Sequence, residues 1–161
     1  MKRYLMYGAV VAACLLLQMT LLPAYLTDPF QPNLLIVMVV YLGLNASNRF
    51  APLAAFGLGI LNDSFSGIFL GLHAFSFLCV YFLLAEVSDR LYTDNRFLLV
   101  LVVFLASIFS ALLDLVMLMI FSVSQGAYAS VLPALIPQAL MNALAASLVA
   151  LVPLPSAEEA R

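Results

Sequence analysis

The chain contains little charge. Its 161 residues include six Lys or Arg and eight Asp or Glu, together 9% of the total, whereas 66% of the residues are hydrophobic. An ordinary soluble domain is about 25% charged and about 45–50% apolar. So few charges cannot cover the surface of a soluble globule, and they exclude a disordered chain and a nucleic-acid-binding domain. The composition predicts an integral membrane protein that contacts the lipid bilayer and no nucleic acid.

Side chains suited to covalent, metal or cofactor chemistry are also scarce. There is one His, and the two cysteines, Cys14 and Cys79, both lie inside apolar runs. Their positions imply no disulfide and match no metal-ligand spacing. A Ser-His-Asp set can be assembled only on paper, from Ser76, His73 and Asp114, with no apparent oxyanion donor. We therefore expect a protein without enzymatic activity, metal or cofactor.

Apolar runs make up most of what is present. A spanning helix takes about 20 apolar residues, so six spans leave room for short loops but for no soluble catalytic domain. The first run follows Lys2 and Arg3, as in a signal peptide, but it is longer than the apolar h-region of a typical signal peptide and no small-x-small site follows it, so we expect a retained helix. We predict a single transmembrane domain over residues 1–161, with spans at about 4–22, 33–46, 51–62, 68–87, 97–121 and 131–152.

The basic residues favour six spans over five. With six spans and a cytoplasmic N-terminus, every basic residue lies on the cytoplasmic side, namely Lys2, Arg3, Arg49, Arg90, Arg96 and Arg161. With five spans, Arg90 and Arg96 would lie outside, against the positive-inside rule. We predict an all-α bundle of six transmembrane helices with both ends in the cytoplasm. The run 51–62 would reach only about 18 Å as a helix, so it must pack against protein, enter the membrane partly or extend into its loop.

Several polar side chains fall inside the apolar runs, where a charged group costs at least about 2.5–3.5 kcal/mol. In the six-span topology most of them share one layer of the outer leaflet, with Asn142 deeper: Gln18, Asp63, His73, Asp114, Gln138 and Asn142. Two interpretations remain open. In the first, these groups satisfy one another and hold the bundle together. In the second, they line a cavity for a small polar ligand or a proton path.

Two glycines four residues apart, Gly67 and Gly71, form a small-xxx-small pattern that allows close packing of helix backbones. Gly67 also follows the turn-forming residues 62–66, so a role in a turn is equally consistent with its position. We treat both glycines as candidate helix-packing positions.

The order of these segments resembles the family of rod-shape-determining MreD proteins over essentially the whole chain. The most specific segment is a Gly-x-x-x-Asp-x-x-x-Gly-x-x-x-Gly-Leu-His block that runs from Gly59 to His73 and includes Asp63. Asn62 departs from the family pattern, which commonly has an apolar residue there. The resemblance is carried by Gln18–Pro23, Pro32–Leu42, Gly57–Gly67, Leu70–Phe75 and Pro137–Asn142.

This resemblance implies a non-enzymatic scaffold of the bacterial elongation machinery in the inner membrane, needed for rod shape and lateral peptidoglycan synthesis. It implies MreC as a partner through its membrane helix, MreB as an indirect partner, and RodA and a class B penicillin-binding transpeptidase in the same complex. It also implies a fold similar to the S-components of energy-coupling-factor transporters. A solute-binding subunit of that kind, with Asp63, His73, Asp114 and Asn142 in its pocket, is the alternative, and a small pore or proton-coupled transporter is a third hypothesis.

Overall fold

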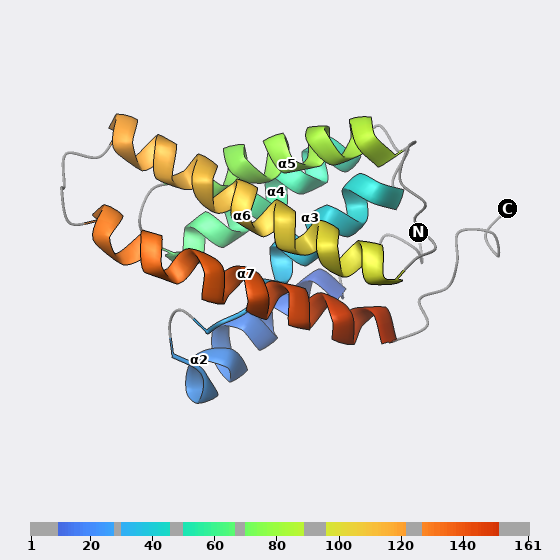
Figure 1. The fold of residues 1–161 in the computed structure, drawn as a ribbon, viewed down its shortest axis with the longest axis horizontal. Coiled ribbons are helices and arrows are strands. Elements are labelled where there is room, and N and C mark those ends of the chain that lie inside the picture. The colour runs from blue at the N-terminus through green and yellow to red at the C-terminus, as the bar shows by residue number, and fades with distance from the viewer. Residues whose placement is uncertain are drawn as a thin grey trace, which may run out of the picture.

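The described part of the chain is entirely helical. The computed structural model describes residues 10–27, 30–45, 50–66, 70–88, 96–121 and 127–151, and these ranges contain no β-strand. They form six helices: a first helix over Val10–Tyr25, which includes the π-helical turn η1 (Leu17–Leu21) and the short α2 (Leu22–Tyr25), then α3 (Leu34–Asn45), α4 (Ala51–Ser66), α5 (Leu72–Ser88), α6 (Arg96–Phe121) and α7 (Ala127–Leu151) (Figure 1). This confirms the all-helical class.

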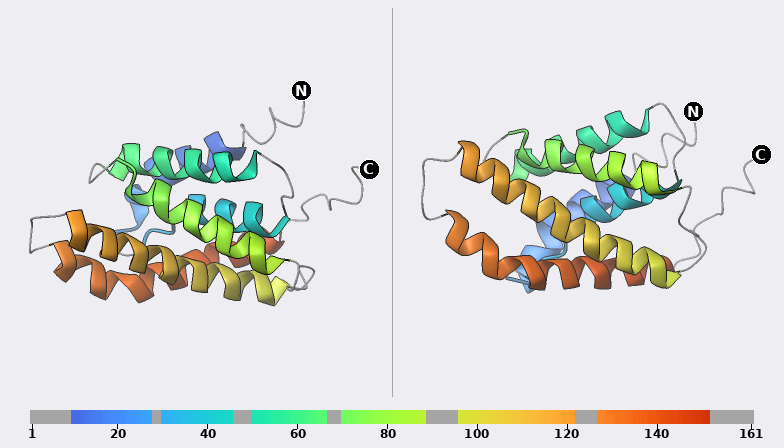
Figure 2. Two further views of the ribbon diagram at one scale, coloured as in Figure 1. Left: turned by 90° about the horizontal axis from the view of Figure 1, so that it is seen from above. Right: turned by 45° about the horizontal axis from the view of Figure 1, so that its top comes forward.

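Helices α3 to α7 run in alternating directions, and α4 to α7 pack around α3. Helix α4 lies against α5, and α6 lies against α7, while α3 contacts all four (Figure 2). The sequence of α3 is apolar along its whole length, which is typical of a helix buried on every side. Accordingly Leu35, Val39 and Val40 are each 0% exposed. The first helix lies at the edge of the bundle and packs against the core through Val11 and Leu15.

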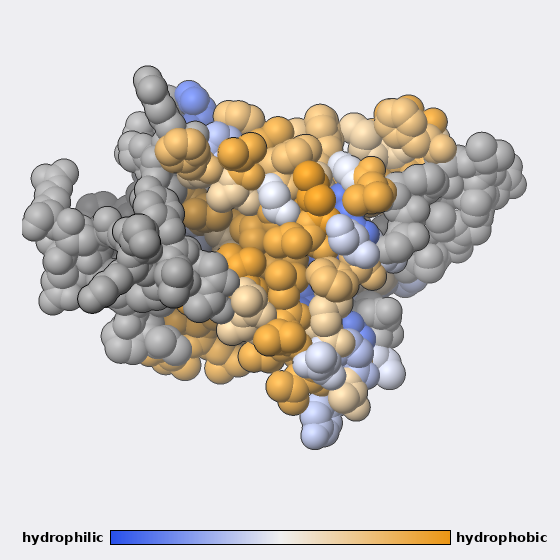
Figure 3. Space-filling view, turned by 180° about the vertical axis from the view of Figure 1, so that it is seen from behind, coloured by the Kyte–Doolittle hydropathy of each residue, from blue (hydrophilic) through white to orange (hydrophobic). Residues whose placement is uncertain are grey.

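The outward surface is apolar and the inside of α7 is lined by small residues. Ala139 and Ala146 are buried, whereas Leu140, Leu144 and Leu148 on the opposite side of the helix are more than half exposed. Large apolar groups outside and small ones inside suit a helix that faces lipid and approaches its neighbours closely. Figure 3 shows apolar residues across the centre of one face. Within the described ranges, two segments are long and apolar enough to cross a membrane, Phe97–Phe121 and Leu132–Leu151.

Helix α4 differs from the predicted span 51–62, because it continues to Ser66. The turn-forming residues that follow Leu61 are therefore helical, and Asn62 and Asp63 are buried rather than placed in a loop. Sixteen residues reach about 24 Å. The element thus extends into its expected loop, one of the three possibilities that its short length left open. Helix α5 begins at Leu72 rather than at residue 68.

Among the described glycines, close helix packing occurs at Gly59 and Gly43. A Cβ built on Gly59 would lie 2.3 Å from the Cα of Ala74, so the backbones of α4 and α5 touch there. A Cβ on Gly43 would lie 2.9 Å from the Cβ of Leu84. Gly71 instead has a φ of 102° and no atom within 4 Å of a built Cβ, which identifies it as a turn residue. Gly67 lies outside the described residues.

The contact at Gly59 yields a stability prediction. Gly59→Ala places a methyl group against backbone atoms that cannot turn aside, and we expect it to destabilise the fold by about 1–3 kcal/mol. Gly57→Ala is the matched control, since a Cβ there meets nothing within 4 Å. It should be neutral or stabilising by up to about 1 kcal/mol, the helix-propensity gain of Ala over Gly. Thermal unfolding of the purified proteins in detergent measures both, and equal stability of the two variants would contradict the close approach of α4 and α5.

Candidate functional site

Asp63, near the end of α4, caps the beginning of α5. Its Oδ2 accepts hydrogen bonds from the backbone N–H groups of Gly71 at 2.8 Å and Ala74 at 3.1 Å, and its Oδ1 accepts one from the N–H of His73 at 2.9 Å. The first N–H groups of a helix have no partner within the helix, and a carboxylate is favoured at that positive end. Because Asp63 is only 2% exposed, this cap replaces water at a helix start enclosed by protein.

The imidazole of His73 joins Asp63 to a second carboxylate. Its Nδ1 lies 2.7 Å from Oδ1 of Asp63, and its Nε2 lies 3.6 Å from Oδ2 of Asp114. The hydroxyl of Ser76 donates to Oδ1 of Asp114 at 2.5 Å, and Phe77 packs edge-on against the imidazole. We call Asp63, His73, Ser76 and Asp114 the acid–histidine cluster. It connects α4, α5 and α6.

The acid–histidine cluster does not have the geometry of a hydrolase triad. The hydroxyl of Ser76 donates to the carboxylate of Asp114 and not to the imidazole of His73. A nucleophilic serine needs a base that accepts its proton, with a third group orienting that base. The described residues also contain no group of three or more His, Cys, Asp or Glu side chains placed to bind a metal ion. The polar chemistry of this region is therefore hydrogen bonding between helices.

A second set of polar groups surrounds the beginning of α3. Asn33 precedes the helix and its Oδ1 accepts from the N–H groups of Leu35 at 3.1 Å and Ile36 at 3.4 Å, as an N-cap does. The N–H of Leu34 donates to Oε1 of Gln18, 3.1 Å away on the first helix. The N–H groups of Leu34, Leu35 and Ile36 therefore all have acceptors. Backbone groups at membrane depth need such partners where the helix itself does not supply them.

The same set extends to α4, α6 and α7. Asn142 accepts from the N–H of Asn33 at 2.6 Å and donates to Oγ of Ser107 at 3.0 Å. Oδ1 of Asn62 accepts from Nε2 of Gln18 at 3.3 Å and lies 3.5 Å from Nδ2 of Asn33. We call Gln18, Asn33, Asn62, Ser107 and Asn142 the α3-cap network. Since Asn62 and Asp63 are consecutive in α4, this network adjoins the acid–histidine cluster.

The structure brings five of the six predicted polar residues into these two groups, and Gln138 faces a cavity beside them. Sequence reasoning missed three participants, which are Asn33, Asn62 and Ser107, and it grouped Ser76 with His73 and Asp114 only as a hydrolase set on paper. A signal was available for Asn33, because an Asn immediately before an apolar run is a helix N-cap pattern. Asn62 and Ser107 are recognised only once the helices are assembled, since Gln18 and Asn142, to which they bond, are more than thirty residues distant in sequence.

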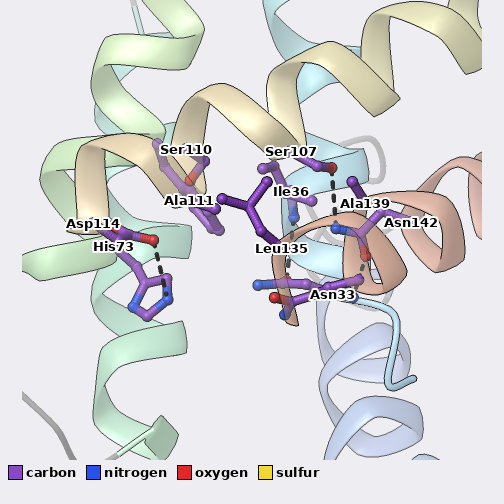
Figure 4. Close-up of a pocket in the computed structure, with 12 residues that line it drawn as sticks. Asn33, Ile36, His73, Ser107, Ser110, Ala111, Asp114, Leu135, Ala139 and Asn142 are labelled. Carbon is purple, nitrogen blue, oxygen red and sulfur yellow. Dashed lines mark hydrogen bonds and ion pairs between the residues drawn. The ribbon is translucent and has the colours of Figure 1, made fainter. Parts of the chain in front are cut away.

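A small cavity lies between the acid–histidine cluster and the α3-cap network. Its volume is about 40 Å³, and Figure 4 shows side chains from α3, α5, α6 and α7 around it. A cavity needs about 10–15 Å³ to hold one water, so this one has room for a small ion or a few water molecules. Its polar lining consists of Asn33, His73, Ser107, Ser110, Asp114, Gln138 and Asn142.

Comparison with protein families identifies the chain. The model of the family described as rod shape-determining protein MreD matches residues 2–154. The chain belongs to the MreD family. Comparisons with curated proteins and with solved structures found no match. MreD proteins are non-enzymatic and lie in the cytoplasmic membrane, where they have a rod-shape-determining role in association with the elongation machinery. The apolar exterior agrees with this membership.

The Asp63 carboxylate makes four hydrogen-bond contacts, and these yield a second stability prediction. Asp63→Asn turns one acceptor oxygen into an amide donor that faces two backbone N–H groups or His73. We expect it to destabilise the protein by about 2–5 kcal/mol, because buried donors lose their acceptors. Ser64→Ala is the neighbouring control, since Ser64 is exposed and its hydroxyl donates only to the carbonyl of Ile60. Thermal unfolding in detergent compares the two, and an Asn variant as stable as the control would refute the capping role.

Proposed function

We propose that this MreD-family chain is a scaffold of the elongation machinery, acting with MreC and MreB in rod shape and lateral peptidoglycan synthesis. The observation that carries the proposal, beside family membership, is how the interior polar groups are used. Asp63 and Asn33 cap α5 and α3, and Gln18, Asn62 and Asn142 complete the connections between helices. These groups fix the arrangement of the helices, which is what a binding surface for other membrane proteins requires.

The proposed assembly includes MreC, MreB, RodA and a class B penicillin-binding transpeptidase. MreC contributes a membrane helix, and the wide apolar exterior offers lipid-facing surface on which such a helix can pack (Figure 3). Contacts with MreB, in this proposal, are indirect. The proposed orientation keeps both ends of the chain in the cytoplasm, which is supported by the positions of the basic residues in the sequence. A helix arrangement similar to that of transporter S-components is part of the same proposal.

The volume of the cavity speaks against the alternative of a solute-binding subunit. Sites for small organic ligands have volumes of about 300–1,000 Å³. The cavity beside His73 and Asp114 has about 40 Å³, too little for a vitamin-sized molecule. Asp63 and Asn142, which the alternative places in the pocket, have their polar atoms engaged by neighbouring helices. The scaffold is therefore the better-supported function.

The region of Gly67 and Gly71 is our proposed contact for the membrane helix of MreC. Gly71 has no neighbour within 4 Å of a built Cβ, so the space beside it is open to a partner. Leu70, the residue before it, is 79% exposed. A small residue next to an exposed apolar one suits the close approach of another helix.

Depletion tests the scaffold role. We expect cells depleted of this protein to lose their rod shape and become round, and we expect the wild-type gene to restore rods. The Asp63→Asn variant should restore them poorly, and Ser64→Ala fully, because only the former disrupts the cap of α5. Cell dimensions measured by microscopy provide the result, with membrane levels of each variant measured in parallel. Rods that persist after complete depletion would count against the scaffold function.

Co-purification tests the proposed MreC contact. Gly71→Leu should reduce recovery of MreC at least tenfold, because a bulky side chain fills the open space. Gly71→Asn is the control for the turn, since Asn tolerates positive φ better than other non-glycine residues. It should retain more MreC than Leu does. Thermal unfolding of both variants separates turn strain from lost contact, and normal recovery of MreC with folded Gly71→Leu would eliminate this surface while leaving the scaffold role intact.

A further inference from the structure

The cavity beside Asp114 contains polar side chains that no other residue uses. Ser110 is 4% exposed and lines the cavity, and its hydroxyl forms no hydrogen bond within the described ranges. Gln138 lines the cavity from α7 and its amide likewise has no partner among the described residues. Every fully enclosed side-chain nitrogen or oxygen in those ranges does have a partner. Ser110 and Gln138 both line the cavity, so their unused polar atoms are available to a species bound there.

The gap between His73 and Asp114 opens onto the same cavity. Their facing atoms, Nε2 and Oδ2, are 3.6 Å apart, which is longer than a hydrogen bond. Since Nδ1 of His73 faces the Asp63 carboxylate, a neutral imidazole carries its proton on Nδ1 and presents a lone pair at Nε2. A lone pair then faces a carboxylate oxygen, so a positively charged or donating species is favoured in the cavity beside these two atoms.

Charge distinguishes Asp114 from Asp63. The negative charge of Asp63 meets three backbone N–H groups at the positive end of α5. Asp114 has one hydroxyl donor, from Ser76. Arg96 is the only Lys or Arg among the described residues, and it precedes Asp114 by eighteen positions, or about 27 Å along α6. His73, 3.6 Å away, is positive only when it is protonated, so beside a neutral imidazole the carboxylate of Asp114 has no positive partner among the described residues, which is costly at this depth.

We propose that the cavity binds one small monovalent cation, of the size of Na⁺ or K⁺. The carboxylate of Asp114 supplies the charge, and Oγ of Ser110 and the amide oxygen of Gln138 supply neutral ligands. Ser110 and Asp114 are one helical turn apart on α6, and Gln138 lines the same cavity from α7. A divalent ion does not suit the site, because Ca²⁺ takes six to eight oxygen ligands and usually several carboxylates. The volume of about 40 Å³ agrees with one ion and little water.

Thermal unfolding of the purified protein tests the site. At fixed pH and equal concentration, NaCl or KCl should raise Tm relative to choline chloride, whose cation is too large for the cavity, and the rise should saturate. The chain contains no Trp, so unfolding is followed by circular dichroism. Ser110→Ala should raise the half-maximal salt concentration by about tenfold, the loss expected for one ligand. Asp114→Asn should abolish the response.

Ser147→Ala is the matched control, because Ser147 lies on α7 outside the cavity lining and donates to the carbonyl of Leu144. Its response to salt should equal that of the wild type. If Asp114→Asn does not fold, Ser110→Ala keeps the carboxylate and still tests the ligand set. An equal Tm in all three salts overturns the proposal. That result assigns the cavity to water only.

Discussion

The four hydrogen-bond contacts of the Asp63 carboxylate determine how α4 and α5 meet. They start α5 at the end of α4, inside protein, where the first backbone N–H groups have no water to bind. Gly71 allows the reversal through its positive φ, and Gly59 lets the backbones of α4 and α5 touch. The position of His73, and through it that of Asp114, follows from this cap.

The beginning of α3 solves the same problem with neutral groups. Asn33 caps its own helix, while Gln18 and Asn142 reach it from the first helix and from α7. Two interior helix starts thus depend on side-chain hydrogen bonds that come from other helices. Such connections specify one arrangement of helices whose apolar contacts alone are not directional. In the proposed scaffold function, this fixed arrangement is the important property, because partner proteins would bind the same surface each time.

Much of the fold was predictable, and the reason is visible in individual segments. The long runs that became α6 and α7 are apolar throughout, so their existence and approximate bounds follow from hydropathy. The boundary between α4 and α5 was not predictable in detail. Asn62 and Asp63 favour turns in isolation, but their tertiary hydrogen bonds keep them helical. The close backbone contacts at Gly59 and Gly43 were not predictable for a similar reason. Close approach depends on which helix lies opposite and not on the spacing of glycines alone.

The sequence by itself determined that this is a membrane protein of six apolar segments with a few polar groups at depth, because charge and hydropathy act locally. It also identified Asp63, His73, Asp114 and Asn142 as residues that need an explanation. Only the tertiary structure decided the partners, by placing His73 between two carboxylates and Asn142 between Asn33 and Ser107. Partner choice depends on how helices pack, and those contacts join residues up to 109 positions apart.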